Sequence, residues 1–264
     1  MPELAEVEFF RKQWDAGLGQ RIRAVDLQAQ TRVFREGDAH ALARHLVGRR
    51  LLGSEARGKQ MLFRFSRGFW LGIHLGLTGK LWVAPPDFQP GKHDLLVLYQ
   101  ARRALVFRDL RRFGRVRWHS GSRPPAWWTR LPPPPTSDSF TLQTLGAFLQ
   151  RHARLALKAA LLLQEGFPGI GNWMADEILW RARLHPARRA GDLDEPARRA
   201  LWKQTRFVCR AALRHVGEDY SALPRNWLFH QRWGGDGRCP RHGTPLRRAR
   251  IGGRTTAWCP QCQP

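Results

Sequence analysis

Four side chains near the C-terminus constrain the fold of this 264-residue chain more than any other feature. Cys239-Pro-Arg-His242 is followed by sixteen residues and then by Cys259-Pro-Gln-Cys262. Each pair has a two-residue spacer, which directs two ligands toward one tetrahedral zinc ion. The segment from residue 234 to residue 264 is too small to bury a core alone. We therefore expect a single structural Zn²⁺, held by Cys239, His242, Cys259 and Cys262, to stabilise it.

The stretch between the two ligand pairs, Arg247–Trp258, can form a hairpin. Arg254 would lie near its tip, from which a side chain can reach a phosphate or an extruded nucleotide. The alternative is a coincidental spacing in which His242 is an ordinary surface histidine. The acidic N-terminus lacks an apolar leader, which indicates a reducing compartment and favours cysteine ligands over disulfides. Cys209 lies in a helical pattern and is expected to be a core thiol.

The formal net charge of +24 and the pI of about 11.6 indicate a polyanionic partner. Basic residues occur throughout the chain rather than in one tail, which favours a broad binding surface. No apolar run approaches the roughly 20 residues that a membrane span needs. Ribosomal and chromatin proteins are equally basic, so charge alone does not separate a nucleic-acid enzyme from a structural nucleic-acid protein.

Sequence periodicity predicts an α+β protein with two main domains. Residues 3–17 read as a helix, with Val7, Phe10 and Trp14 near one face. Short β-rich runs follow, separated by turn residues, and predict an antiparallel sandwich or barrel over residues 1–123. These runs are Met61–Phe65, Phe69–His74, Leu95–Tyr99, Leu105–Arg108 and Val116–Trp118.

Six prolines between Pro124 and Pro135 predict an extended, semi-rigid linker over residues 124–135. A helical domain is expected over residues 136–230 and a zinc finger over 231–264. The helical patterns are Leu142–Gln150, Leu155–Gln164, Trp173–Arg183 and Pro196–Val216.

The segment Phe167-Pro-Gly-Ile-Gly-Asn172 separates two of these helical patterns. Its glycines permit backbone geometry that exposes amide groups, and Asn172 can cap the next helix. Free amides at a helix N-terminus bind phosphate. By itself the segment is equally an ordinary corner between helices, but Arg151, Arg154 and Lys158 nearby favour a phosphate site.

The N-terminus offers a candidate nucleophile. Removal of Met1 would expose the secondary amine of Pro2, and an α-amino group titrates near pH 8. Such an amine can attack a sugar C1′ to give an iminium that permits elimination. Glu3 and Glu6 can act as acids or bases, although both also suit a helix N-terminus. Lys59 follows Gly58, which suggests a tight turn, and a lysine can exchange a proton; the alternative is an ordinary hairpin lysine.

Taken together and in this order, these pieces resemble the Fpg/Nei family of formamidopyrimidine-DNA glycosylases and endonuclease VIII-like enzymes. The segments that carry the resemblance are MPELAEVE, GKQMLF, HLGLTG, DLRRFG, LKAALLLQEGFPGIGNWMADE and RTTAWCPQC, and they run nearly end to end. The resemblance implies an N-terminal β-sandwich with a leading helix, a helix-two-turns-helix domain and a C-terminal zinc-finger hairpin. It also implies base-excision repair of damaged double-stranded DNA by a glycosylase that is also an apurinic/apyrimidinic-site lyase.

The family pattern implies roles for particular residues. Pro2 would form the Schiff base, Glu3 would donate a proton at the sugar, and Lys59 would serve β-elimination. Arg254 would contact the lesion-side phosphate and serve δ-elimination. Leu77, Arg111 and Phe113 would fill the space of the flipped base. The other expected DNA contacts are His93, Arg112, Arg154, Lys158 and Asn172.

Three residues depart from the family pattern: Ala5 replaces a proline, Leu77 a methionine and His242 a cysteine. The segment from Val216 to Cys239 also resembles the shorter endonuclease VIII branch. Oxidised purines are slightly favoured as substrates, with oxidised pyrimidines as the alternative. A silent damage sensor and a basic zinc-finger transcription or RNA-binding factor are the competing functions. We expect a monomeric, cytoplasmic, nucleoid-associated bacterial protein without a membrane partner.

Overall fold

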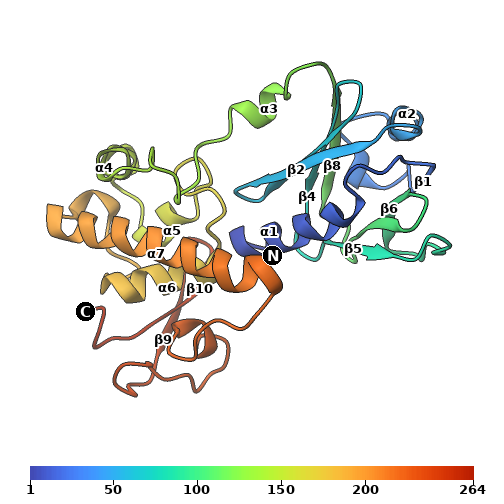
Figure 1. Cartoon of the computed structure of the whole chain (residues 1–264). Helices are drawn as coiled ribbons and strands as arrows, with labels where there is room; N and C mark the ends of the chain where they lie inside the picture. The colour runs from blue at the N-terminus through green and yellow to red at the C-terminus, as the bar shows by residue number, and fades with distance from the viewer. The chain divides into compact units, whose positions relative to one another are not determined.

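The computed structural model describes residues 1–264, which divide into two compact units (Figure 1). The N-terminal unit comprises Met1–Pro2 and Glu6–Leu131, and the C-terminal unit comprises Glu3–Ala5 and Pro132–Pro264. None of the helices combines the length and apolarity that crossing a membrane requires. The first helix, α1, spans Leu4–Gln13, and a short 3₁₀ turn, Trp14–Gly17, continues it.

The N-terminal unit contains two four-stranded antiparallel sheets. One sheet has the order β1 (Ala24–Leu27), β6 (Asp94–Tyr99), β7 (Ala104–Arg108) and β5 (Lys80–Ala84). The other has the order β2 (Leu51–Arg57), β3 (Gln60–Phe65), β4 (Phe69–His74) and β8 (Arg115–Ser120). The predicted strands are confirmed to within two residues at each end.

Apolar side chains cover both faces of the central strands. The main core includes Val7 and Phe10 of α1 and Trp14 of the 3₁₀ turn, as their spacing predicted. A separate cluster on β3 and β4 contains Leu62, Trp70 and Trp128. Because both faces are covered, β4 reads as a continuous apolar run rather than an alternating one.

The proline-rich stretch differs from the extended linker that the sequence predicted. Residues Ala126–Thr129 form a short helix, α3, and Trp128 is buried in the cluster with Leu62 and Trp70. The boundary between the compact units falls after Leu131. The two tryptophans Trp127 and Trp128 therefore draw the first part of the stretch onto the β domain, because their burial outweighs the extended preference of the flanking prolines.

The C-terminal unit is helical and ends in a hairpin. Its helices are α4 (Leu142–Arg151), α5 (Leu157–Leu161), α6 (Asn172–Ala182) and α7 (Glu195–Asp219), and its strands are β9 (Arg247–Ile251) and β10 (Arg254–Trp258). The hairpin matches the predicted range, whereas α5 is shorter than expected. Leu4 and Ala5 belong to the apolar core of this unit, together with Cys209, which is confirmed as a buried thiol.

Candidate functional site

Lys59 lies in the two-residue turn that joins β2 and β3, where Arg57 pairs with Gln60. Gly58 has a φ of +61°, a conformation that favours glycine and permits so tight a turn. The turn therefore holds Lys59 at the end of a rigid hairpin, where its side chain is half-buried.

His74, at the end of β4, is a site residue that the sequence analysis missed. Its Nδ1 atom accepts a hydrogen bond of 3.0 Å from the Gly76 amide. Burial, reinforced by nearby cations including Arg115 and Lys59, lowers the pKa of His74 to about 4. The imidazole is consequently neutral near pH 7, and its lone pair fixes the start of the loop that carries Leu77.

Asp109 ties that loop to a second one, residues 109–114, which carries the predicted DNA contacts Arg111 and Phe113. Its Oδ1 atom accepts hydrogen bonds from the Thr78 hydroxyl at 2.6 Å and the Arg111 amide at 3.2 Å. Its Oδ2 atom accepts one from the Gly114 amide at 2.7 Å. This fully buried carboxylate thus positions both loops at once, although the sequence analysis assigned it no role.

The residues of these loops that are predicted to fill the space of the flipped base are partly exposed, as insertion into DNA would require. Leu77 and Phe113 are half-buried, and the Arg111 guanidinium lies 4.8 Å from the centre of the Phe113 ring. Arg32 covers the same ring at 4.3 Å. Leu110, which sequence reasoning overlooked, is 58% exposed next to Arg111. Leu110 follows Asp109, whose hydrogen bonds hold the loop, and no local sequence pattern indicates those hydrogen bonds.

Hydrogen bonds of His93 and Arg112 join the second loop, residues 109–114, to residues 92 and 93. The His93 carbonyl accepts a hydrogen bond from the Asp109 amide at 2.9 Å, while its Nδ1 atom is buried without a partner. The Arg112 guanidinium donates to the Lys92 carbonyl at 3.2 Å, and Arg112 has a φ of +55°. Of these two predicted DNA contacts, Arg112 therefore lies within the second loop and His93 lies beside it.

In the C-terminal unit, Glu3 caps helix α6. Its carboxylate accepts hydrogen bonds from the amides of Gly171 at 2.9 Å, Trp173 at 3.0 Å and Met174 at 3.1 Å. A negative charge is favourable there because it meets unpaired amides and the positive end of the helix dipole. The expectation that these amides bind phosphate is wrong for the three that Glu3 occupies.

Gly171 is required for this contact. A Cβ atom at this position would lie 2.3 Å from Cδ of Glu3, which no real contact permits. Gly171 is also the N-cap residue of α6, so Asn172 is the first residue of the helix and not its cap as predicted. Instead, the Asn172 side chain donates to the Thr255 carbonyl at 3.0 Å and joins α6 to the hairpin.

Lys158 is fully buried and forms an ion pair with Asp176. Its Nζ atom also donates to the Asn172 carbonyl at 2.6 Å. Burial lowers the pKa of Lys158, and the charge of Asp176 opposes that shift. The prediction that Lys158 contacts DNA directly is wrong, because its ammonium group has no exposed surface. Arg154 by contrast is exposed, in the turn before α5.

Asp176 connects four parts of the C-terminal unit. Its Oδ2 atom accepts two hydrogen bonds from the Arg232 guanidinium, at 2.7 and 3.0 Å, and one from the Ala257 amide at 3.3 Å. One carboxylate on α6 therefore holds α5 through Lys158, the segment before the zinc ligands through Arg232, and strand β10. The sequence analysis named neither acid nor arginine, because their partners are far apart in the chain.

The four predicted zinc ligands come together, with their ligand atoms within 4.8 Å of one another. Sγ of Cys262 lies 3.7 Å from Sγ of Cys239 and 3.5 Å from Nε2 of His242. A tetrahedral site with zinc–sulfur bonds of about 2.3 Å requires sulfur–sulfur separations of about 3.8 Å. The donor set and its spacing therefore fit a tetrahedral metal ion. The three cysteines of the set are free thiols, as is the fourth cysteine of the chain, Cys209.

The hairpin carries Arg254 next to its tip. Ile251 pairs with Arg254 across a turn in which Gly252 and Gly253 have φ values of +59° and +75°. Arg254 is exposed, as expected for a residue that reaches a ligand. Trp180 of α6 supports the Cys/His cluster, since its Nε1 atom donates to Sγ of Cys239 at 3.4 Å.

Pro2 precedes α1 and is half-buried, and Met1 is 51% exposed before it. The nitrogen of Pro2 is in a peptide bond with Met1 here, so the free amine requires removal of Met1. Glu6 lies in the first turn of α1 and is half-buried.

Two family models match this chain. Residues 1–116 match the formamidopyrimidine-DNA glycosylase N-terminal domain, and residues 131–222 match the formamidopyrimidine-DNA glycosylase H2TH domain. The chain belongs to the formamidopyrimidine-DNA glycosylase family. The predicted N-terminal sheets, helix-two-turns-helix domain and C-terminal Cys/His hairpin are confirmed with it.

Two curated members of the formamidopyrimidine-DNA glycosylase family illustrate the extent of the match. The Thermomicrobium roseum enzyme is 38% identical over 84% of this chain and 84% of its own length. The Thermus thermophilus enzyme is 36% identical over 100% of this chain and 98% of its own length. Both bear the name formamidopyrimidine-DNA glycosylase.

Solved structures of a family member from Lactococcus lactis superpose on the whole chain. One, a complex with a THF-DNA and an inhibitor, has a TM-score of 0.88 and 28% identity, with 100% of both chains covered. Another is bound non-covalently to DNA that contains an AP site, with a TM-score of 0.87, 28% identity and 99% of both chains covered.

Proposed function

We propose that this protein excises oxidised bases from double-stranded DNA and then cleaves the strand at the resulting abasic site. The observation that carries the proposal is the pair Pro2–Glu3. Pro2 supplies the amine once Met1 is removed, and the carboxylate of the next residue is fixed by three amides of α6. A sensor or a transcription factor needs neither feature.

The chemistry follows from the residue types. The Pro2 nitrogen bonds to C1′, the glycosidic bond breaks, and the base leaves with a proton. The Glu3 carboxylate takes up the proton that the Pro2 nitrogen loses and passes it to the ring oxygen as the sugar opens to an iminium. Loss of the C2′ proton then expels the 3′ phosphate, for which Lys59 is the proposed acid/base. Loss of the C4′ proton expels the 5′ phosphate, which Arg254 would assist by binding phosphate.

Borohydride trapping tests this proposal. Reduction of the iminium should join wild-type protein covalently to a duplex that contains an abasic site, and Pro2→Gly should sharply reduce trapping. Mass spectrometry of the intact chain should show that Met1 is absent from the active form. Tight binding of damaged DNA by wild-type protein without any trapped adduct would instead favour the silent damage sensor.

Lesion preference is a separate part of the proposal. Oxidised purines are favoured, and oxidised pyrimidines are the alternative. Both lesion classes occur in solved structures of the Lactococcus lactis relative, whose wild-type form was crystallised with an oxidised-pyrimidine DNA and a mutant of it with a Fapy-dG DNA. Single-turnover cleavage of duplexes with 8-oxoguanine, formamidopyrimidine, thymine glycol and dihydrouracil decides between them. Faster excision of the two pyrimidine lesions would overturn the purine assignment.

We also propose that the Cys/His cluster holds one structural Zn²⁺, because all four tetrahedral positions have protein ligands. The protein would act as a cytoplasmic monomer on nucleoid DNA. Sedimentation of the free protein and of its complex with a lesion duplex tests the monomer, and a 2:1 protein-to-duplex complex on a short single-lesion duplex would contradict it.

A further inference from the structure

The outward face of α7 carries a row of cations. An α-helix advances by about 100° per residue, so Arg199, Lys203, Arg206, Arg210 and Arg214 fall within about 80° of one another. The buried residues Leu201, Val208 and Ala212 lie on the opposite side. We call the surface formed by the five cations the α7 basic face.

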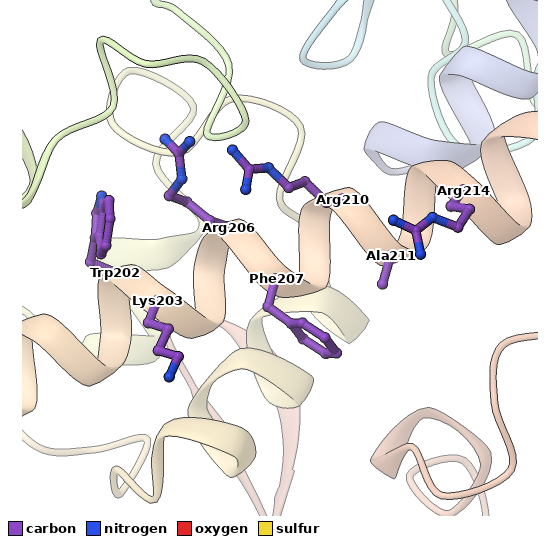
Figure 2. A pocket seen from close by; sticks show the side chains of 7 residues that line it. All are labelled: Trp202, Lys203, Arg206, Phe207, Arg210, Ala211 and Arg214. Carbon is purple, nitrogen blue, oxygen red and sulfur yellow. The ribbon is translucent and has the colours of Figure 1, made fainter.

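This surface contains a shallow groove of about 320 Å³. Figure 2 shows Arg206 and Arg210 pointing to one side of the helix and Lys203 and Phe207 to the other. The short side chain of Ala211 lies along the groove on the side of Phe207, and Arg214 lies at its C-terminal end.

Most of these charges are not neutralised within the protein. Lys203, Arg210 and Arg214 are exposed and form no hydrogen bond or ion pair through their side chains. Arg199 and Arg206 are the exceptions. Arg199 pairs with the exposed Glu195 carboxylate at 2.7 Å, and Arg206 donates to the Phe140 carbonyl at 3.4 Å and lies 3.6 Å from the exposed Asp138 carboxylate. No acidic residue lies between Glu195 and Glu218, so the helix lacks the mixed signs of an ordinary solvated face.

We propose that the α7 basic face binds the phosphodiester backbone of a second DNA segment while the lesion site is occupied. From Lys203 to Arg214 the helix rises about 16 Å, which spans roughly five phosphates of one strand. The site residues of this unit lie on the α6 N-terminus, the turn before α5 and the hairpin, and none lies on this face. Held by two sites, the enzyme would transfer between DNA segments without full release.

The occupant we propose is a second duplex segment, which rests on the proposed action on double-stranded DNA, and a single strand is the alternative that the test separates from it. Three neighbouring cations suit either one. Phe207 is 47% exposed in the same groove, and an exposed ring beside cations can stack a splayed base. Preferential binding of a single strand, reduced by Phe207→Ala, would assign the groove to single-stranded DNA, whereas equal binding with no effect of Phe207→Ala assigns it to a duplex.

The experiment uses the full chain saturated with an uncleavable THF-containing duplex. A fluorescent undamaged duplex or single strand is then titrated in at several salt concentrations. We expect a second binding event in wild type. The triple variant Lys203→Gln, Arg210→Gln, Arg214→Gln should lower the log–log salt slope of that event by up to about 2.7. Over a fourfold rise in salt, wild type should then lose up to roughly 40-fold more affinity than the variant. Glutamine preserves helix propensity.

The matched control replaces three exposed arginines of the N-terminal unit, Arg23→Gln, Arg64→Gln and Arg102→Gln, and so removes the same net charge. Both triple variants should cleave a lesion duplex at the wild-type single-turnover rate, which separates this proposal from the proposed catalytic function. Absence of a second binding event in wild type would overturn the proposal. So would equal losses in the two triple variants, because they would show a general charge effect.

Discussion

The Thr78 hydroxyl donates a 2.6 Å hydrogen bond to the carboxylate of Asp109, and this contact joins two loops that are 31 residues apart in the chain. The same carboxylate holds the Gly114 amide, so both loops share one anchor. Leu77 and Phe113, which are predicted to fill the space of the flipped base, therefore have a common support, and their positions should depend on Asp109 more than on each other.

Replacing Asp109 by alanine should destabilise the N-terminal unit and loosen both loops. A buried donor left without its partner costs about 1–3 kcal/mol, and Asp109→Ala strands the Gly114 amide as well as the Thr78 hydroxyl. Denaturant unfolding measures the loss, and affinity for a lesion duplex should fall with it. Thr78→Val removes only one of the Asp109 contacts, together with a 3.1 Å hydrogen bond from the exposed Arg111 amide, and should cost less. A larger loss from Thr78→Val would contradict the shared anchor.

Replacing Glu3 by glutamine tests the cap on α6. The glutamine oxygen can still accept a hydrogen bond, but its amide group faces another donor, so at least one of the three contacts is lost. Loss of a cap costs about 1 kcal/mol, and we expect Glu3→Gln to destabilise the C-terminal unit by that amount. Glu218→Gln, which changes an exposed acid of the same unit, is the control. Equal melting temperatures for both variants would argue against the cap.

Local patterns made much of this fold predictable. The continuous apolar run of β4 and the glycine pair in the β9–β10 turn identify their elements from a few neighbouring residues. The Cys/His cluster was predictable for the same reason, since each pair of candidate ligands needs only a two-residue spacer. Strand β2, with Gly53, Ser54 and Glu55 at its centre, has no such pattern and was missed, because it is held in the sheet by pairing with β3.

The groups that organise the site could not be predicted in this way. Asp109 and Asp176 each bind partners from distant segments. Lys158 was predicted to bind phosphate because the local sequence does not show that it is buried in an ion pair with Asp176. Glu3 was predicted as a site residue, but its contact with α6 spans 168 residues to Gly171. Contacts between residues so far apart in the chain cannot be inferred from local spacing in one sequence.

Asp176 should be the most sensitive charge in the C-terminal unit. Removing one member of a buried ion pair costs about 3–5 kcal/mol, and Asp176→Asn weakens the support of two buried cations, Lys158 and Arg232. Lys158→Met leaves Asp176 paired with Arg232 and should cost less. Arg199→Gln, which breaks the exposed pair with Glu195, should cost under about 1 kcal/mol. A ranking with Lys158→Met above Asp176→Asn would refute the central role of Asp176.

Metal analysis should find one zinc per chain, and chelation should unfold the segment from about residue 234 onward. Metal binding and folding are coupled in such small segments, because the ligands are brought together only in the folded state. Loss of the hairpin displaces Arg254 and should weaken binding to a lesion duplex. Cys259→Ser should behave like the chelated protein, whereas Cys209→Ser should retain zinc because Cys209 is a core thiol. Undiminished DNA binding by Cys259→Ser would contradict the structural role of the metal.

Acid should weaken the N-terminal unit through His74. The folded pKa of about 4 lies below the ordinary value of 6.5, so between these values the unfolded chain binds a proton that the folded chain does not. The free energy of unfolding should therefore fall as the pH drops from 6.5 to 4, by at most about 1.4 kcal/mol per pH unit. His74→Gln has no proton to bind and keeps an acceptor for the Gly76 amide, so its unfolding should show a shallower pH dependence across this window. His40→Gln, an exposed histidine of the same unit, should leave the dependence unchanged. Identical pH profiles for wild type and His74→Gln would show that the imidazole does not remain neutral in the folded protein.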